Sequence, residues 1–148
     1  MGSDREAKVR RIVVAAKAGA DQPWLAQAAA EIAEQQGASV DVVSADGVDI
    51  EAFSTIPREE ASGPPHDAAE AMAEQIRAAG VEARPHVLHG PVATSVLLFA
   101  EQHDADLIVA GASSRSRVAQ RLLGTVPVEL IRRARRPVLV ITPPDNQN

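Results

Sequence analysis

The segment VAGASSRSRVAQRLLGTVPVELI, residues 109–131, decides the fold, because it connects an apolar run to an amphipathic one through glycine and hydroxylated residues. Gly111 ends the apolar run, and Gly124 with Thr125 directly precedes the amphipathic stretch. Glycine turns and helix starts both present unpaired backbone N–H groups, which attract anions. The segment is therefore either an ordinary loop between two elements or a loop that gathers N–H donors around an anion.

Five short runs rich in aliphatic residues predict β-strands. They cover residues 11–16, 39–44, 81–88, 106–111 and 137–142. Within them IVV, LIV and VLVI are nearly continuous, which is typical of parallel strands covered on both faces. Pro85 in the third run cannot donate a hydrogen bond to a neighbouring strand, so we expect that strand at an edge of the sheet.

Four amphipathic stretches between these runs predict helices. The first opens at Asp21, has Pro23 in its first turn and ends at Gly37, in line with the usual cap preferences. The others cover about residues 67–79, 92–103 and a stretch that begins near Thr125. Residues 46–66, which contain Pro57, Pro64 and Pro65, show no period and are expected to form a long surface connection.

This alternation predicts an α/β domain of three layers, in which helices cover an open, twisted, parallel five-stranded sheet with right-handed crossovers. A strand order of 3-2-1-4-5 makes the chain reverse its winding between the first and fourth strands. Ligands bind beyond the carboxyl ends of the strands at such a reversal. The loops at residues 17–19 and 111–115 would then face each other across one crevice.

The composition of the chain limits which classes of partner and binding site are possible. The chain has 148 residues, 45% of them hydrophobic, which suffices for one core, and it has no cysteine for disulfides or thiolate metal sites. A net charge of −5 argues against nucleic acid, and no apolar run approaches the ~20 residues that span a bilayer. We expect a cytoplasmic protein without membrane or nucleic-acid partners. Residues 1–9 are expected to be a polar extension, 10–142 one domain and 143–148 a frayed tail.

Two common nucleotide-binding signatures are absent from the sequence: there is no G-x-x-x-x-G-K-[ST] loop, and no G-x-G-x-x-G follows the first strand. The segment DADLIVAGASSRSRVAQRLLGTVPVELIRRARRPVLVI instead resembles the C-terminal signature of the universal stress protein superfamily. Nucleotide-binding members show Gly, two residues, Gly, nine residues, Gly, then Ser or Thr. Here the pattern reads Gly111, Ser114, Gly124, Thr125.

The resemblance extends over residues 10–142 and implies a Rossmann-like, HUP-type fold. It implies a protein of stress response or signalling that binds ATP, ADP, AMP or cyclic AMP at the loops after the first and fourth strands. It assigns ligand-binding positions to Ala16, Lys17, Ala45, Gly111, Ser113, Ser114, Arg115, Gly124, Thr125 and Val126. Amides of residues 113–115 would form an anion-binding nest, and the Thr125 hydroxyl would either donate to phosphate or cap the helix.

Two residues depart from the family pattern. Ser114 stands where the family has its middle glycine, so it either strains a left-handed turn or adds a hydroxyl donor. Lys17 stands where the family usually has an aspartate, and a charged lysine attracts phosphate but cannot hold a metal. We therefore expect no obligatory cofactor, and Mg²⁺-assisted binding is disfavoured. Lys17 pointing into solvent is the alternative.

Other features are expected to be structural. His66, His86, His89 and His103 lack metal-ligand spacing, and Ser113, Ser114 and Ser116 lack a matched His–Asp pair for nucleophilic catalysis. The run RRARR, residues 132–136, falls at the end of the last helix, where cations meet the helix dipole favourably. No general base is evident, so any ATP hydrolysis is expected to be slow.

The resemblance also implies a homodimer, paired through the last strand from Pro137 to Ile141, that passes its ligand state to a client protein of unknown identity. Two alternatives remain open at this point. The chain could be a nucleotide-free interaction module, as in the branch of the family that binds no nucleotide, or a weak ATPase.

Overall fold

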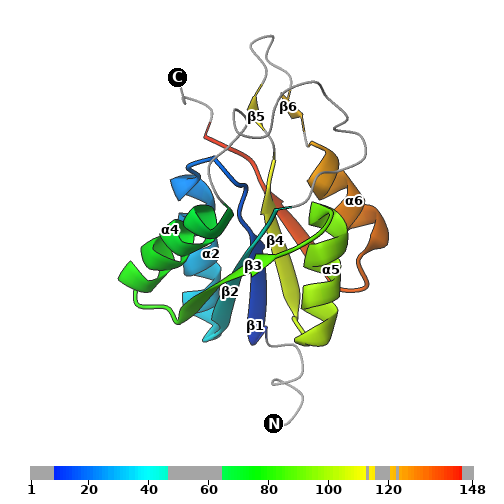
Figure 1. Ribbon diagram of the computed structural model, residues 1–148. Helices are drawn as coiled ribbons and strands as arrows, with labels where there is room; N and C mark the ends of the chain where they lie inside the picture. The colour runs from blue at the N-terminus through cyan, green and yellow to red at the C-terminus, as the bar shows by residue number, and fades with distance from the viewer. Residues whose placement is uncertain (1–8, 47–64, 113, 116–120, 123, 145–148) are drawn as a thin grey trace.

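The computed structural model describes residues 9–46, 65–112, 114–115, 121–122 and 124–144. A parallel sheet stands between two layers of helices, with the carboxyl ends of its strands at the top of Figure 1. The strands of this sheet are β1 (Arg11–Ala15), β2 (Ser39–Ala45), β3 (Ala83–Leu88), β4 (Leu107–Gly111) and β7 (Val138–Ile141). The helices are α2 (Pro23–Gln36), α4 (Pro65–Ala78), α5 (Val92–Gln102) and α6 (Thr125–Arg133).

The sheet has five strands in the order β3-β2-β1-β4-β7, and every neighbouring pair is parallel. This confirms the predicted fold class and the order 3-2-1-4-5. Pro85 lies in β3, which is an edge strand as predicted. A two-stranded antiparallel pair, β5 (Ser114–Arg115) and β6 (Arg121–Leu122), follows β4 and was not predicted, because two-residue strands leave no hydrophobic period.

Two cores, one on each face of the sheet, explain the continuous apolar runs. Ile12 and Val14 of β1 belong to the core beneath α2 and α4, whereas Val13 between them belongs to the core beneath α5 and α6. Successive side chains of a strand point to opposite faces, so a strand covered on both sides must be apolar throughout. Leu25 of α2 and Leu130 of α6 are fully buried in their respective cores.

The ends of α2 show one confirmed prediction and one correction. Gly37 ends the helix in the left-handed conformation, with φ of 70°, as predicted. The helix begins at Pro23 with Gln22 as its N-cap, so the prediction that Asp21 opens it was wrong by one residue. The reason is that the Gln22 carbonyl is the first acceptor, receiving the N–H of Ala26 at 3.1 Å.

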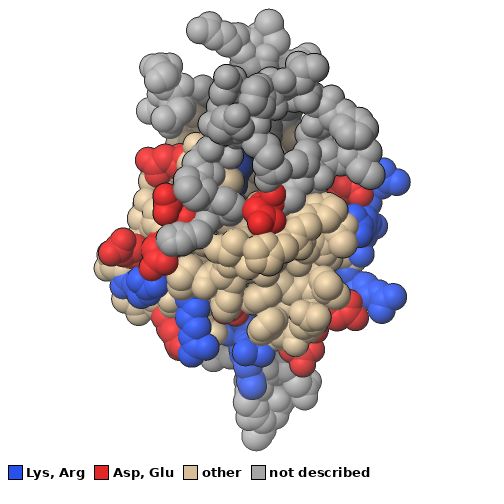
Figure 2. All heavy atoms as spheres, in the orientation of Figure 1, with Lys and Arg blue, Asp and Glu red and all other residues tan. Residues whose placement is uncertain are grey.

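Much of the predicted 46–66 connection lies outside the described residues, as do residues 1–8 of the expected extension and 145–148 of the tail. On the face seen in Figure 2, acidic and basic side chains of the described residues are interspersed rather than gathered by sign. No helix among the described residues is long and apolar enough to span a membrane.

Candidate functional site

The sheet opens at the carboxyl ends of β1 and β4. These strands pair as far as Ala15 and Ala110. Beyond that point the Ala16 N–H donates to the carbonyl of Val43 in β2 at 2.8 Å. The Ala112 N–H donates to the carbonyl of Ile141 in β7, also at 2.8 Å. The two strand ends therefore diverge. The segment after β1 leads to α2, whereas the chain after β4 leads to α6 on the opposite face of the sheet (Figure 1). This is the reversal of winding at which open α/β sheets bind ligands.

The loop after β1 is a tight turn that is closed by a backbone hydrogen bond. The Ala20 N–H donates to the Lys17 carbonyl at 3.1 Å, and Gly19 has a φ of 80°. The Lys17 N–H donates at 3.1 Å to Oε1 of Gln22, whose side chain is only 7% exposed. The Lys17 amide is therefore already satisfied within the protein. What Lys17 offers a ligand is its exposed ammonium group.

Gly111 has a structural reason for being glycine that the sequence did not reveal. It is not among the residues with a positive φ, so no left-handed turn requires it. A Cβ at this position would lie 2.7 Å from Cη2 of Trp24 and 3.2 Å from Nε2 of Gln22. The indole of α2 therefore packs directly on the glycine backbone, and the α2 side of the rim is occupied by Trp24 and Gln22. Both residues were missed because their contact to Gly111 spans most of the chain.

The loop after β4 is partly described. Ser113 lies outside the described residues. Ser114 and Arg115 form β5, in which Ser114 is opposite Leu122 and Arg115 is opposite Arg121 of β6. The predicted nest of amides at residues 113–115 therefore stays a prediction. The structure adds that two of these three residues belong to a β-pair beyond the end of β4.

The amino end of α6 lies on the other side of the opening. Gly124 is its N-cap, with φ of 91° and ψ of 165°, and no side chain caps the helix. The capping role considered for Thr125 is not observed, because Thr125 is the first helical residue and is exposed. Val126 packs against the core beneath α5 and α6. Since Pro127 has no N–H, the first turn offers the amides of Thr125 and Val126 as donors.

The end of β2 supplies the remaining candidate. Ala45 is the last residue of β2, is buried and lies opposite Leu88 of β3. The next residue, Asp46, accepts a 2.8 Å hydrogen bond from Nδ1 of His89. This hydrogen bond holds the pKa of Asp46 below its ordinary value. From the sequence His89 was expected to be structural, and its pairing with Asp46, which lies 43 residues away in the chain, was not predicted.

Metal ligands are not brought together in the described part of the chain, where no group of three or more His, Asp or Glu side chains could hold an ion. His86 pairs with Asp41 at 2.8 Å and lies against Phe99, with 4.8 Å between their ring centroids. The three histidines whose side chains the structure describes, His86, His89 and His103, therefore each have their own hydrogen-bond partner rather than facing a shared metal position.

Comparison with known protein families gives a match over residues 8–142, a range that includes every strand and helix described above. The chain belongs to the universal stress protein family. This confirms the resemblance found in the segment around Gly111 and Gly124. The family match covers both loops of the rim as well as the sheet that supports them.

The curated relatives match over part of their length. The chain is 41% identical over 76 residues to a universal stress protein of Mycobacterium tuberculosis, which covers 51% of this chain and 50% of the relative. The chain spans about 40% to 50% of the length of the curated relatives it matches.

Solved structures match over nearly the whole chain. The universal stress protein from Archaeoglobus fulgidus in complex with dAMP is 26% identical, with a TM-score of 0.65, over 89% of this chain and 97% of that chain. A universal stress protein in complex with cAMP is 24% identical, with a TM-score of 0.69, over 93% of this chain and 99% of that chain. At that identity the second structure shows the shared fold alone.

Proposed function

We propose that this universal stress protein binds an adenine nucleotide (ATP, ADP, AMP or cAMP) at the rim between β1 and β4. The observation that carries the proposal is the parting of the two strand ends, where the Ala16 and Ala112 amides bond to different neighbouring strands. The bound dAMP of the Archaeoglobus fulgidus relative supports the choice of an adenine nucleotide.

The phosphate end of the nucleotide is assigned to the amino end of α6. The Thr125 and Val126 amides at a helix N-terminus, together with the positive end of the helix dipole, favour an anion. The exposed Lys17 ammonium adds a positive charge from the opposite loop. Because Lys17 is a cation, binding should not require Mg²⁺. The backbone at Ala16 and Ala45 would border the nucleoside end of the nucleotide. Gly111 and residues 113–115 would lie along the ligand between its nucleoside and phosphate ends.

A nucleotide-free interaction module is the second candidate, and a specific observation favours it. The Gln22 side chain accepts the hydrogen bond of the Lys17 amide, and the Trp24 indole packs on Gly111. Part of the rim is therefore already filled by the protein's own side chains. If these side chains take the place of the nucleoside, the protein acts through protein contacts alone. The same binding experiment distinguishes the two candidates.

Trp24 makes the test direct, because the chain has one tryptophan and its ring lies on Gly111 at the rim. Each nucleotide is titrated to millimolar concentration, with and without Mg²⁺, while Trp24 emission is followed; isothermal titration calorimetry provides a second readout. Saturable binding that is independent of Mg²⁺ supports the proposal. Failure of all four nucleotides to bind by both methods refutes it and leaves the interaction module.

Two glycine variants provide a matched control. Gly124→Ala places a side chain at a φ of 91° at the start of α6, whereas Gly80→Ala does so at a φ of 89° at the end of α4, away from the rim. Both substitutions place an alanine at a positive φ near 90°, which strains an L residue. Nucleotide affinity should fall at least about tenfold in Gly124→Ala and stay near the wild-type value in Gly80→Ala.

We further propose that the protein is a homodimer paired through β7, with a client protein that reads the ligand state. β7 is an edge strand, and Leu139 on it is 37% exposed. Pro137 and Ile141 direct their carbonyls toward β4, so the Val140 N–H points to the open edge. Val140→Pro should therefore convert a dimer to a monomer in sedimentation velocity without breaking the β4 ladder. An unchanged sedimentation coefficient would refute this arrangement.

A further inference from the structure

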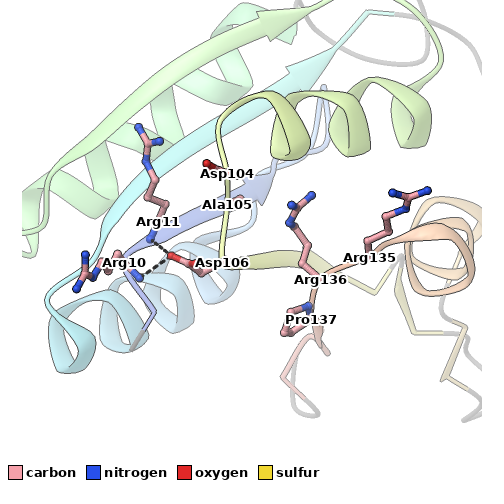
Figure 3. Close-up of a pocket in the computed structure, with 8 residues that line it drawn as sticks. All are labelled: Arg10, Arg11, Asp104, Ala105, Asp106, Arg135, Arg136 and Pro137. Atoms are coloured by element: carbon pink, nitrogen blue, oxygen red, sulfur yellow. Dashed lines mark hydrogen bonds between the residues drawn. The ribbon is translucent and has the colours of Figure 1, made fainter. Parts of the chain in front are cut away.

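A hollow of about 560 Å³ lies at the amino end of the sheet, opposite the nucleotide rim. Its walls come from the start of β1, the segment before β4 and the segment between α6 and β7 (Figure 3). The residues that line it are Arg10, Arg11, Asp104, Ala105, Asp106, Arg135, Arg136 and Pro137. Three segments that are distant in sequence thus bring four arginines to one place in a chain with a net charge of −5.

The carboxylate at the floor of the hollow does not neutralise these arginines. Oδ2 of Asp106 accepts the backbone N–H groups of Arg10 at 2.9 Å and Arg11 at 3.0 Å. The Arg11 guanidinium donates to the His103 carbonyl at 2.6 Å, which is a neutral acceptor. Asp106 therefore joins β1 to β4 by hydrogen bonds to the main chain, and the guanidinium charges of its neighbours are left exposed.

Three of the four guanidiniums have no protein partner in the part of the chain that the structure describes. The side chains of Arg10, Arg135 and Arg136 make no ion pair or hydrogen bond with another described residue, although all three border the same hollow. Arg132 and Arg133, by contrast, both pair with Glu129, at 3.9 and 3.6 Å. An anion in the hollow would therefore be attracted by three cations that have no counter-ion among the described residues.

The helix dipole explains only half of the RRARR motif. α6 ends at Arg133, and Ala134 after it is extended. Arg132 and Arg133 in the last turn can therefore meet the negative end of the dipole, as predicted from the sequence. Arg135 and Arg136 lie beyond the last turn of the helix, where the dipole effect falls off, and both are among the residues that line the hollow.

We propose that this hollow binds a compact anion built from two or three linked phosphate groups. Guanidinium groups match phosphate oxygens in bidentate geometry, and the hollow falls within the size range of small-molecule sites. Figure 3 shows the guanidiniums spread around the hollow rather than meeting at one point, with Arg11 and Arg136 on either side of Asp106. Spread charges suit a ligand that carries several charges along its length. The Asp104 carboxylate on the wall repels any anion and therefore works against the attraction of the four arginines.

The test follows backbone amide resonances of the full chain during titration with inorganic tripolyphosphate. Sodium chloride of equal ionic strength serves as the blank, because exposed charges respond to salt alone. We expect saturable shifts of the amides of Arg10, Arg11, Ala105 and Asp106 and their neighbours, which lie at the opposite end of the sheet from any shifts at the rim and are fitted separately. ATP in a parallel titration distinguishes a free polyphosphate from the phosphate chain of a nucleotide.

Matched double variants assign the binding to the hollow. Arg135→Gln with Arg136→Gln should weaken tripolyphosphate binding at least about tenfold, whereas Arg132→Gln with Arg133→Gln removes the same charge and should change it less than about twofold. Asp104→Asn should strengthen binding, because it removes a negative charge from the wall. Asparagine tolerates the left-handed backbone of Asp104, whose φ is 55°, so this variant keeps its fold.

Shifts that do not saturate, or equal weakening by both double variants, would mean general charge attraction and would overturn the site. Binding of a poly-glutamate peptide in the absence of tripolyphosphate binding would also overturn the phosphate assignment. Gly124→Ala at the opposite end should leave tripolyphosphate affinity at the hollow unchanged, so this inference and the proposed nucleotide site can fail separately.

Discussion

Replacing Gly111 by alanine tests the contact that organises the rim. The added methyl group would lie 2.7 Å from Cη2 and 3.1 Å from Cζ3 of the Trp24 indole, well inside normal van der Waals contact. The indole must move, although it is rigid and packed against the core beneath α2. Overpacking of this kind destabilises proteins by about 1–3 kcal/mol. Because the φ of Gly111 is not positive, the backbone itself accepts alanine.

The expected sign depends chiefly on Trp24, because the remaining close contact, Nε2 of Gln22 at 3.2 Å, is the end of a side chain that has to shift by only a few tenths of an ångström. Without the clash, Gly→Ala at a permissive backbone position stabilises by about 0.4–1 kcal/mol, because the unfolded chain loses freedom. In the wild-type background the net effect on the free energy of unfolding should be a loss of about 1–2 kcal/mol. This corresponds to a fall in Tm of roughly 3–8 °C for a chain of this size.

A double-mutant cycle with Trp24→Phe supplies the decisive measurement. Phenylalanine lacks the outer part of the indole, so Gly111→Ala in that background should be neutral or slightly stabilising. Urea unfolding followed by far-ultraviolet circular dichroism gives the four free energies, and the coupling energy should be at least about 1 kcal/mol. Equal destabilisation in both backgrounds would refute the argument that Trp24 is what requires a glycine here.

Three further predictions concern other parts of the molecule. Gly124→Ala should lower the free energy of unfolding by about 1–3 kcal/mol in urea titrations, because its φ of 91° is reserved for glycine. His89→Ala should raise the pKa of Asp46 toward its ordinary value in a carbon-detected NMR titration; the stability from this contact is present above the ordinary aspartate pKa and is lost as the pH falls through the lowered one. Leu130→Ala in the fully buried core should destabilise by about 2–5 kcal/mol in thermal unfolding, whereas Ile131→Ala, at 51% exposure, should change stability by less than about 0.5 kcal/mol.

The fold was readable from the sequence because its signals are local. The continuous runs IVV, LIV and VLVI indicated strands covered on both faces, and the structure places Val13 and Val14 in different cores. Gly37 marked a helix end because it takes a left-handed conformation there. The first residue of α2 was misplaced because aspartate is a preferred N-cap residue and glutamine is not, and only the hydrogen bonds of the folded chain show that Gln22 takes that position.

The reversal of winding between β1 and β4 was predictable from the sequence, whereas the side chains around it were not. Strand order and the glycine pattern located the rim between β1 and β4. The side chains that occupy its α2 side could not be predicted, because the contact of Trp24 with Gly111 joins residues far apart in the chain. The separation of Arg135 and Arg136 from the last turn of α6 was hidden for a similar reason: the sequence shows five adjacent residues, and only the structure shows where the helix stops.

The two edge strands of the sheet, β3 and β7, differ in their ability to pair with a further strand. Glu82 and Leu88 direct their carbonyls toward β2, so the missing N–H of Pro85 falls on the outer side of β3, where an incoming strand would need a donor. The opposite edge at β7 keeps its donors. In the proposed dimer, in which two copies pair through β7, both outer edges would be β3 strands that carry Pro85. The missing donor disfavours pairing with a further copy there, so the proposed arrangement favours closure at two copies over growth into a fibre.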